Sequence, residues 1–414
     1  MTQFPQASTL DAALSLSRDP YRWIARTAAD NNGAFEARLM LKPTVFLSGY
    51  DGARFFYSEA FERGGAAPAF LIKGLFGEGG VQGLDDSAHR HRKALFLNLV
   101  GPDHIPEILA EVAKGLATLA QSGQPQIYLQ DEMALVLTRA VCNWAGIPVA
   151  EKGLADRALT LTQLFEHAAP TGPSHLRARV ARAKANRWIA GELQYLRAGQ
   201  RKEAPDKPAM RIAFARDMVG ELLPLEVAAV EMLNILRPVV AISVYATFCA
   251  HALHRFPHTR EALETDRDIL SFVQEVRRFY PFFPMIAAVA ARNVDHAGGV
   301  IPKGCRVVLD IYGTNHDPRL WPEPDTFHPS RFDGLRVNPF ALIPQGGGDY
   351  AKGHRCPGEF FTIAILQQVV GWLVEEVAYD VPDQDLRLDM TALPALPKSR
   401  MILQDLRARV MGPA

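Results

Sequence analysis

Residues 224–256 constrain the fold more than any other part of the chain. The segment begins with Pro224, which the first turn of a helix tolerates, and it is apolar on nearly every face of a helix. A helix of this length with no polar face has to be surrounded by other elements. We therefore expect it to cross the centre of the protein, with the rest of the chain packed around it.

Two residues in the middle of this segment work against folding. Arg237 carries a fixed positive charge, and burying a guanidinium is costly unless an anion meets it. Pro238 cannot donate a backbone hydrogen bond to the carbonyl of Asn234, so we expect it to kink the helix at a cost of about 3 kcal/mol. An internal salt bridge from Arg237 to Glu231 is one explanation, although Glu231 lies off the same helix face. A functional role for Arg237 is the other.

The remaining periodicity is mostly helical. Apolar residues recur at three- and four-residue spacing in residues 105–120, 131–146 and 177–196. The polar segment 197–210 is typical of an exposed loop and not of a domain boundary. Strand signals are confined to residues 37–49 and 300–313, the second with a turn at 302–304. The sequence predicts a mainly α protein with a small β-sheet region, in which residues 1–414 form a single domain.

The helix predicted over residues 177–196 carries a stripe of basic side chains. Such a stripe can dock an acidic redox partner, but it is more often a solvated face, and we prefer that interpretation. The residues are Arg177, Arg179, Arg182, Lys184 and Arg187.

Charge and composition narrow the class of partner. Lys+Arg and Asp+Glu both number 45, so there is no electrostatic reason to expect a nucleic acid or an anionic membrane surface. The N-terminal region does not resemble a secretory signal, and no uninterrupted apolar run reaches the roughly 18 residues of a membrane span. The four cysteines form no CxxC pair, which argues against disulfides and zinc fingers. We expect a soluble cytoplasmic protein that binds a small molecule.

A single cysteine stands in a setting suited to chemistry. Residues 344–366, PQGGGDYAKGHRCPGEFFTIAIL, pass from a glycine-rich loop through Cys356 into an apolar helix that is predicted to begin near Pro357. The N-terminus of a helix favours a thiolate, and glycines let backbone amides approach a sulfur or a flat cofactor. Taken alone, the same stretch also fits a turn beside a buried thiol.

Two further motifs remove that ambiguity. Glu275 and Arg278 are spaced i and i+3, and the proline-rich segment 323–332 places Arg331 shortly before the cysteine loop. In this order the motifs resemble the cytochrome P450 superfamily over nearly the whole chain. The resemblance implies a triangular helical prism around haem b, with Cys356 as the axial thiolate ligand of the iron. It also implies that Glu275, Arg278 and Arg331 brace the cysteine loop.

The resemblance extends to the residues that hold the cofactor. His89 and Lys93, at i and i+4, are similar to the family's propionate-binding pair, and Arg92 lies beside them. His354, in the cysteine loop, is also expected to contact the haem. An exposed basic helix start is the alternative for the first three residues.

The chain departs from the family in two places. Asp349 occupies the position, seven residues before the cysteine, where the family usually has phenylalanine. Arg237 and Pro238 replace the acid and alcohol that deliver protons to dioxygen in a typical member. A substrate carboxylate paired with Arg237 would restore the missing acid–base group and let hydrogen peroxide serve as the oxidant.

These departures are similar to the fatty-acid peroxygenase branch of the superfamily, as are residues 81–96. That resemblance implies hydroxylation of long-chain fatty acids at the α or β carbon, with hydrogen peroxide and without a redox partner. Gln82 stands where hydroxylases have glutamine and decarboxylases have histidine, which favours hydroxylation. We therefore expect Arg237, Pro238 and Gln82 to be catalytic.

The acyl chain needs an apolar channel, and aromatic side chains are the candidates for its walls. The bulk of Phe283 favours oxidation at the α carbon. The other open functions are a decarboxylase that produces terminal alkenes, a reductase-coupled P450 monooxygenase, and a haem-binding sensor or carrier without turnover. The candidate channel residues are Phe76, Phe165, Phe282 and Phe283.

Overall fold

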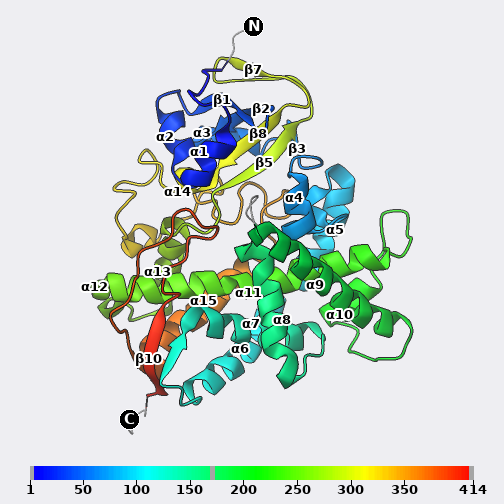
Figure 1. Ribbon diagram of the computed structural model, residues 1–414, viewed down its shortest axis with the longest axis vertical. Coiled ribbons are helices and arrows are strands. Elements are labelled where there is room, and N and C mark those ends of the chain that lie inside the picture. Colours follow the sequence, from blue (N-terminus) through cyan, green and yellow to red (C-terminus); the bar gives the residue numbers. More distant parts are fainter. Residues whose placement is uncertain (1–3, 168–172, 410–414) are drawn as a thin grey trace.

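Helices surround one long central helix, and the larger sheet lies at the end of the molecule that holds the N-terminus (Figure 1). The computed structural model describes residues 4–167 and 173–409. Its α-helices are α1 Ala12–Arg18, α2 Trp23–Ala29, α3 Gly49–Phe56, α4 Ala69–Leu71, α5 Asp86–Leu99, α6 Ile105–Ala120, α7 Leu129–Ala145, α8 Glu151–Glu166, α9 Pro173–Arg197, α10 Pro208–Ala213, α11 Leu225–Arg255, α12 Pro257–Glu261, α13 Asp266–Phe279, α14 Ile311–Asn315 and α15 Glu359–Gly371.

Short π-helices, 3-10 helices and strands complete the described part of the chain. The π-helices are η1 Ile72–Phe76 and η5 Trp372–Glu376, and the 3-10 helices are η2 Val81–Gly83, η3 Pro102–His104 and η4 Pro329–Phe332. The strands are β1 Ala34–Leu39, β2 Lys42–Leu47, β3 Phe61–Glu62, β4 Gln126–Tyr128, β5 Met285–Ala290, β6 Val294–His296, β7 Gly299–Ile301, β8 Arg306–Asp310, β9 Val377–Asp380 and β10 Ile402–Ala408.

The predicted strand segments meet in one sheet. Residues 37–49 cover part of the β1–β2 hairpin, and residues 300–313 contain the end of β7, the predicted turn and β8. Strand β2 pairs in parallel with β8, with Thr44 opposite Arg306, in the sheet order β1-β2-β8-β5-β3. Strand β7 pairs instead with β6. The prediction of a mainly helical protein with a small sheet region is confirmed.

Helix α11 is the predicted central helix. It crosses the molecule in contact with α7, α8, α9 and α15, and it runs through Pro238 without interruption (Figure 1). It is long and apolar enough to span a membrane, but 89% of its most apolar stretch is buried inside the protein. Nearly all of its side chains from Ala228 to Leu253 are buried, as expected for a helix whose apolar surface packs against other helices.

The predictions for the helical half are confirmed, with one correction on α9. Helices α6, α7 and α9 cover the three periodic segments. Four of the five basic residues on α9 are exposed, in agreement with a solvated face. Arg182 is only 4% exposed, so the prediction was wrong for this residue. It lies on the same helix face as the buried Ala178 and Ala185, which are four residues before it and three after it.

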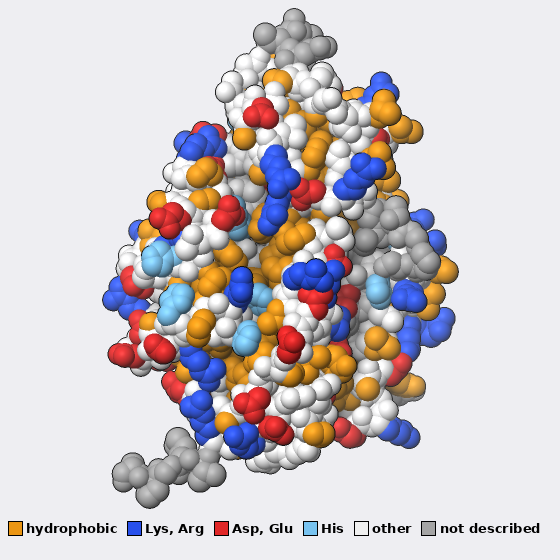
Figure 2. All heavy atoms as spheres, turned by 60° about the vertical axis from the view of Figure 1, so that its left-hand side comes forward, with side chains coloured by type: hydrophobic (Ala, Val, Ile, Leu, Met, Phe, Trp, Pro, Cys, Tyr) orange, Lys and Arg blue, Asp and Glu red, His pale blue; other side chains and the backbone are white. Residues whose placement is uncertain are grey.

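Charges of both signs are dispersed over one face of the molecule. On the face shown in Figure 2, Lys and Arg side chains alternate with Asp and Glu side chains, and no extended area carries a single sign. This distribution agrees with equal numbers of basic and acidic residues in the sequence.

A buried histidine predicts how stability depends on pH. His251 Nδ1 lies 2.7 Å from the hydroxyl of Tyr280, and Nε2 lies 3.0 Å from the carbonyl of Leu386. Burial lowers the pKa of His251 to about 4. Between pH 6.5 and about 4 the unfolded chain therefore binds a proton that the folded chain does not, and stability falls with decreasing pH by about 1.4 kcal/mol per unit.

Urea unfolding at a series of pH values checks this dependence. In His251→Gln the free energy of unfolding should fall less steeply below pH 6.5 than in the unaltered protein. Part of the slope should persist, because burial also lowers the pKa of His316, to about 3. An unchanged slope in His251→Gln would contradict the assignment to His251.

Candidate active site

The cysteine loop is held in place by its own backbone. The amide of Cys356 donates a hydrogen bond to the carbonyl of Gln345 at 3.1 Å, and the Gln345 amide nitrogen lies 3.9 Å from Cys356 Sγ. Glycine is required at Gly347, where a Cβ would lie 2.5 Å from the carbonyl oxygen of Pro339. Helix α15 begins at Glu359, two residues later than predicted. These contacts fix the position of the sulfur just before the helix N-terminus.

Burial of Cys356 opposes the effect expected of the helix N-terminus. Burial raises the pKa of the thiol, while a hydrogen bond from the backbone of Gly358 and the charges of Lys93 and Arg277 act in the opposite direction. A bound metal ion deprotonates a coordinating thiol outright, so the sulfur is suited to a metal and not to free nucleophilic chemistry.

The structure brings the predicted brace together. Glu275 accepts hydrogen bonds from Arg278 Nε at 2.7 Å and from Arg331 Nε at 3.2 Å, and its side chain is fully buried. The backbone N–H of His328 also donates to Glu275, at 2.8 Å. Helix α13, which carries Glu275, begins with a capping box formed by Thr265 and Asp268. One carboxylate thus ties α13 to the segment before the cysteine loop.

A second ion-pair network, which the sequence analysis missed, reaches the loop directly. Glu359 accepts hydrogen bonds from Arg277 Nη2 and Arg355 Nε, each at 2.6 Å. Arg277 also donates to the side chain of Gln345 at 3.0 Å. Glu359 follows the cysteine by three residues, and that spacing was the available signal. The network joins α13 and α15 on both sides of Cys356.

Basic and histidine side chains lie beside the loop. Lys93 Nζ donates to the carbonyls of Gly353 and Arg355, and the rings of His89 and His354 stack with centroids 3.8 Å apart. Arg63, also missed from the sequence, is buried, with its guanidinium 4.2 Å from the centre of the Phe56 ring. No spacing or motif marks Arg63 in the sequence.

Arg63 and Lys93 supply the positive charge of this group, because burial lowers the pKa of His89 to about 4 and leaves its ring neutral at pH 7. Burial and the charges of Arg63, His89 and Lys93 lower the pKa of His354 to about 2. The carboxylate of Asp85 lies 3.9 Å from His354 and already accepts hydrogen bonds from the backbone N–H groups of Arg63 and Gly64. A buried thiol with Arg63 and Lys93 nearby fits a haem, whose iron takes the sulfur and whose propionates are anionic.

Arg92 points away from this group. Its Nη1 atom donates to Glu231 Oε1 at 2.5 Å, and both side chains are buried between α5 and α11. A role for Arg92 in haem binding stays a prediction, and this ion pair does not favour it. The same ion pair also removes Glu231 as a salt-bridge partner for Arg237. Glu231 is bound to Arg92 and to Asn234, whose Nδ2 donates to it at 2.9 Å.

Arg237 lies buried on α11 without an anionic partner among the residues described. Its Nη1 donates to the carbonyl of Leu75 at 2.6 Å, and its Nη2 lies 3.4 Å from Asn234 Oδ1. Burial lowers the pKa of Arg237 to about 10, and a negative charge on Cys356 would oppose that shift. The internal salt bridge considered from the sequence is therefore wrong.

Gln82 is linked to Arg237 through one residue. Asn234 Nδ2 donates to Gln82 Oε1 at 3.1 Å, and Asn234 Oδ1 faces the guanidinium of Arg237. Asn234 was not among the residues predicted from the sequence, although its position three residues before Arg237 places it on the same helix face. Pro238 follows in the helix and is partly buried. The polar side chains thus form a chain from η2 to the guanidinium.

The candidate channel phenylalanines occupy different surroundings. Phe76 lies beside Arg237, whose Cζ is 6.0 Å from the centre of its ring. Phe282 stacks on Tyr245 of α11 at 4.5 Å, and Phe283 packs between the helical core and the core beside the sheet. Phe165 is 9% exposed within the helical core. Only Phe76 contacts Arg237 directly, and the channel role of all four stays a prediction.

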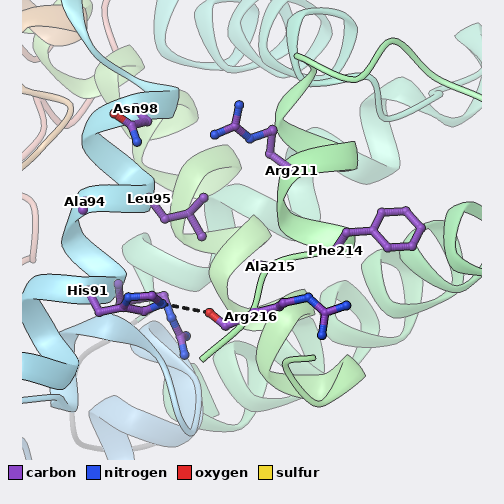
Figure 3. Close-up of a pocket in the computed structure, with 9 residues that line it drawn as sticks. His91, Ala94, Leu95, Asn98, Arg211, Phe214, Ala215 and Arg216 are labelled. Carbon is purple, nitrogen blue, oxygen red and sulfur yellow. Dashed lines mark hydrogen bonds between the residues drawn. The ribbon is translucent and has the colours of Figure 1, made fainter. Parts of the chain in front are cut away.

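A separate surface pocket of about 400 Å³ lies between α5 and α10 (Figure 3). The ring of His91 meets the backbone carbonyl of Arg216, with Nε2 3.0 Å from that oxygen, and the Arg216 side chain points away from His91. The pocket is lined by neither Cys356 nor Arg237. It is therefore distinct from the surroundings of Cys356 and Arg237.

Comparisons with known proteins agree with this geometry. The family model Cytochrome P450 matches residues 270–403. Cytochrome P450 71D180 of Thymus vulgaris is 32% identical over 124 residues, and cytochrome P450 71D18 of Mentha gracilis is 31% identical over 140 residues. These matches cover 29% and 32% of this chain, and 24% and 27% of the plant proteins, so the chain aligns with only about a quarter of their length.

Solved structures match over almost the whole chain. Cytochrome P450EX alpha (CYP152N1) with myristic acid has a TM-score of 0.95 and 42% identity, covering 99% of this chain and 100% of that one. Cytochrome P450SP alpha (CYP152B1) in complex with (R)-ibuprofen has a TM-score of 0.93 and 43% identity, covering 96% and 99%. A variant of cytochrome P450 OleT with arachidonic acid has a TM-score of 0.95 and 29% identity, covering 99% and 100%. The chain therefore belongs to the cytochrome P450 superfamily, in the branch of the CYP152 fatty-acid peroxygenases.

Proposed function

We propose that this protein is a haem-thiolate peroxygenase that hydroxylates long-chain fatty acids with hydrogen peroxide, at the α carbon in preference to the β carbon. The observation that carries the proposal is Arg237, a buried guanidinium that forms no ion pair in the described part of the chain. Such a group needs an anion, and a fatty acid brings a carboxylate on an apolar body.

The ligands named for the similar structures support the same substrate class. Myristic acid, arachidonic acid and (R)-ibuprofen are all carboxylic acids with a large apolar part. An acyl carboxylate beside Arg237 would form a charge-assisted pair, and the hydrocarbon chain would lie against apolar side chains such as Phe76.

The residues of the site suit haem b as the cofactor. Cys356 would ligate the iron, and Arg63, His89, Lys93 and His354 would surround the propionates. When bound, the haem supplies the iron centre at which peroxide is activated and the substrate is oxidised. The ion-pair networks of Glu275 and Glu359 keep the cysteine loop in position for that ligand.

The chain positions the substrate, and the substrate supplies acid–base chemistry. Arg237 and Pro238 occupy the place of the usual acid and alcohol, so the substrate carboxylate is the group beside Arg237 that can take a proton from peroxide and return it. A carboxylate held at this point leaves only the α and β carbons close to the haem. No redox partner protein is required, and we expect the enzyme to act in the cytoplasm.

Turnover with peroxide alone tests the proposal. Purified enzyme should convert myristic acid when hydrogen peroxide is added without a reductase or nicotinamide, and chiral chromatography should identify the 2-hydroxy acid as the main product. A requirement for a ferredoxin or flavin reductase would instead support the reductase-coupled monooxygenase. Absence of any product from a haem-loaded enzyme would support a sensor or carrier.

Formation of a terminal alkene by decarboxylation is the second candidate, and Gln82 favours hydroxylation over it. Its amide accepts a hydrogen bond from Asn234, next to Arg237, and an amide is a poorer proton donor than a histidine. We predict that Gln82→His raises the terminal-alkene share of the products several-fold, measured by gas chromatography, whereas Gln82→Asn does not. An unchanged product ratio in Gln82→His would remove Gln82 from the catalytic residues.

A further inference from the structure

A second buried guanidinium lies next to Arg237. Arg182, on α9, donates from Nε to the carbonyl of Gly74 at 3.0 Å and from Nη2 to the carbonyl of Leu75. The Leu75 carbonyl also accepts the hydrogen bond from Arg237 Nη1. One backbone oxygen at the end of η1 therefore joins two arginine side chains from different helices.

The two guanidinium groups lack a compensating charge. Neither forms an ion pair within residues 4–167 and 173–409, and Arg182 Nη1 is buried there without a hydrogen-bond partner. Burial and the positive charge of Arg237 lower the pKa of Arg182 to about 9. Both groups remain protonated at neutral pH, so each destabilises the other until an anion binds nearby.

Capping of η1 accounts for only part of this arrangement. The hydrogen bonds to Gly74 and Leu75 satisfy carbonyl groups that a short helix leaves without partners at its C-terminal end. That role needs neither the free Nη1 donor nor a second arginine on the same carbonyl. A neutral donor such as glutamine would cap the turn without the cost of a buried charge.

We propose that Arg182 is a positioning and specificity-determining residue of the fatty-acid head-group site. It keeps the Leu75 carbonyl hydrogen-bonded when Arg237 turns its donors toward a substrate carboxylate, so that no buried acceptor is left without a partner. It also adds a second positive charge, which selects an ionised carboxylate over a neutral head group. This inference rests on the proposed function for its substrate class.

Ligand binding to the variants Arg182→Gln and Arg182→Lys tests the inference. The probes are myristate and 1-tetradecanol, which have the same chain length and differ in the charge of the head group, and the signal is the shift of the haem absorption band. Arg179→Gln is the matched control, because Arg179 is exposed on the same helix. The red-shifted band of the reduced carbon-monoxide complex verifies that each variant retains its haem and thiolate.

Arg182→Gln should weaken myristate binding about tenfold and leave 1-tetradecanol binding within twofold. Arg182→Lys should recover most of the affinity because it keeps the charge, and Arg179→Gln should match the unaltered protein. For oxidation of myristate by Arg182→Gln, kcat/KM should fall mainly because KM rises. If Arg182→Gln lost the same affinity for both ligands, Arg182 would only stabilise η1 and would not select the head group. Unchanged myristate binding would overturn the inference.

The binding assay separates this inference from the proposed function. It requires haem and ligand but neither peroxide nor turnover. If peroxide fails to support oxidation while Arg182→Gln still loses myristate selectively, the peroxygenase assignment fails and the head-group site stands. If peroxide supports oxidation and Arg182→Gln binds both ligands normally, the assignment stands and the role of Arg182 fails.

Discussion

Replacing Arg237 by alanine is expected to lower kcat/KM for peroxide-driven oxidation of myristic acid by about a hundredfold or more, with the haem-thiolate spectrum unchanged. The buried guanidinium donates to Leu75 and faces Asn234, and no carboxylate of the described chain neutralises it. Without it, the substrate carboxylate loses both its anchor and its position as acid–base group. Steady-state kinetics with varied myristic acid, at fixed peroxide, measures the loss.

Two further variants make this result specific. Arg255→Ala, in the exposed last turn of the same helix, should retain full activity. Arg237→Lys should fall between the alanine variant and the unaltered enzyme, since an ammonium keeps the charge but cannot form the bidentate pair. Activity of Arg237→Ala within a few-fold of the unaltered enzyme would show that the substrate carboxylate is not held by this residue.

The second large effect is expected on stability. Glu275→Gln keeps the shape of the side chain but leaves the buried guanidinium groups of Arg278 and Arg331 without their carboxylate. Removing one partner of a buried ion pair destabilises a protein by about 3–5 kcal/mol. We therefore expect a lower midpoint of urea unfolding, and weaker haem retention because the cysteine loop is no longer braced.

An exposed carboxylate provides the control for this variant. Glu264→Gln, just before α13, removes the same charge from a solvated position and should change the free energy of unfolding by less than about 0.5 kcal/mol. If Glu275→Gln were as stable as Glu264→Gln, the contacts of Glu275 with the two arginines would not be what holds the loop.

Local motifs made much of this site predictable. Glu275 and Arg278 are one helical turn apart, so their pairing follows from helix geometry, and Cys356 stands out because glycines and a helix start surround it. The apolar character of residues 224–256 likewise dictates a central helix. In each case the information lies within a short stretch of sequence.

The missed residues depend on contacts between distant segments. The charge of Arg63, which follows β3, acts on His354 of the cysteine loop, and Arg277 reaches Glu359 across 82 positions, which no local spacing indicates. Arg182 differs from these residues, because its burial could have been predicted from local spacing. Its spacing from Ala178 and Ala185 places it on the buried face of α9, but a stripe of neighbouring basic residues favoured an exposed one. The position of Arg182 in the helical repeat therefore predicted its burial better than its residue type did.

The effect of burial on charge was also not available from the sequence. Helix position alone predicted a thiolate at Cys356, whereas its enclosure raises the pKa of the thiol. Similarly, Glu231 was a candidate partner for Arg237 until the fold placed Arg92 of α5 against it. Which charge pairs with which is decided by packing between helices.

Comparison of myristic acid with its methyl ester, under peroxide alone, tests the central claim most directly. The two compounds share a chain, but only the acid supplies a carboxylate to Arg237 and a group that can exchange a proton with peroxide. We predict rapid hydroxylation of the acid and a rate for the ester lower by about a hundredfold or more. Equal rates for the acid and the ester would contradict the account.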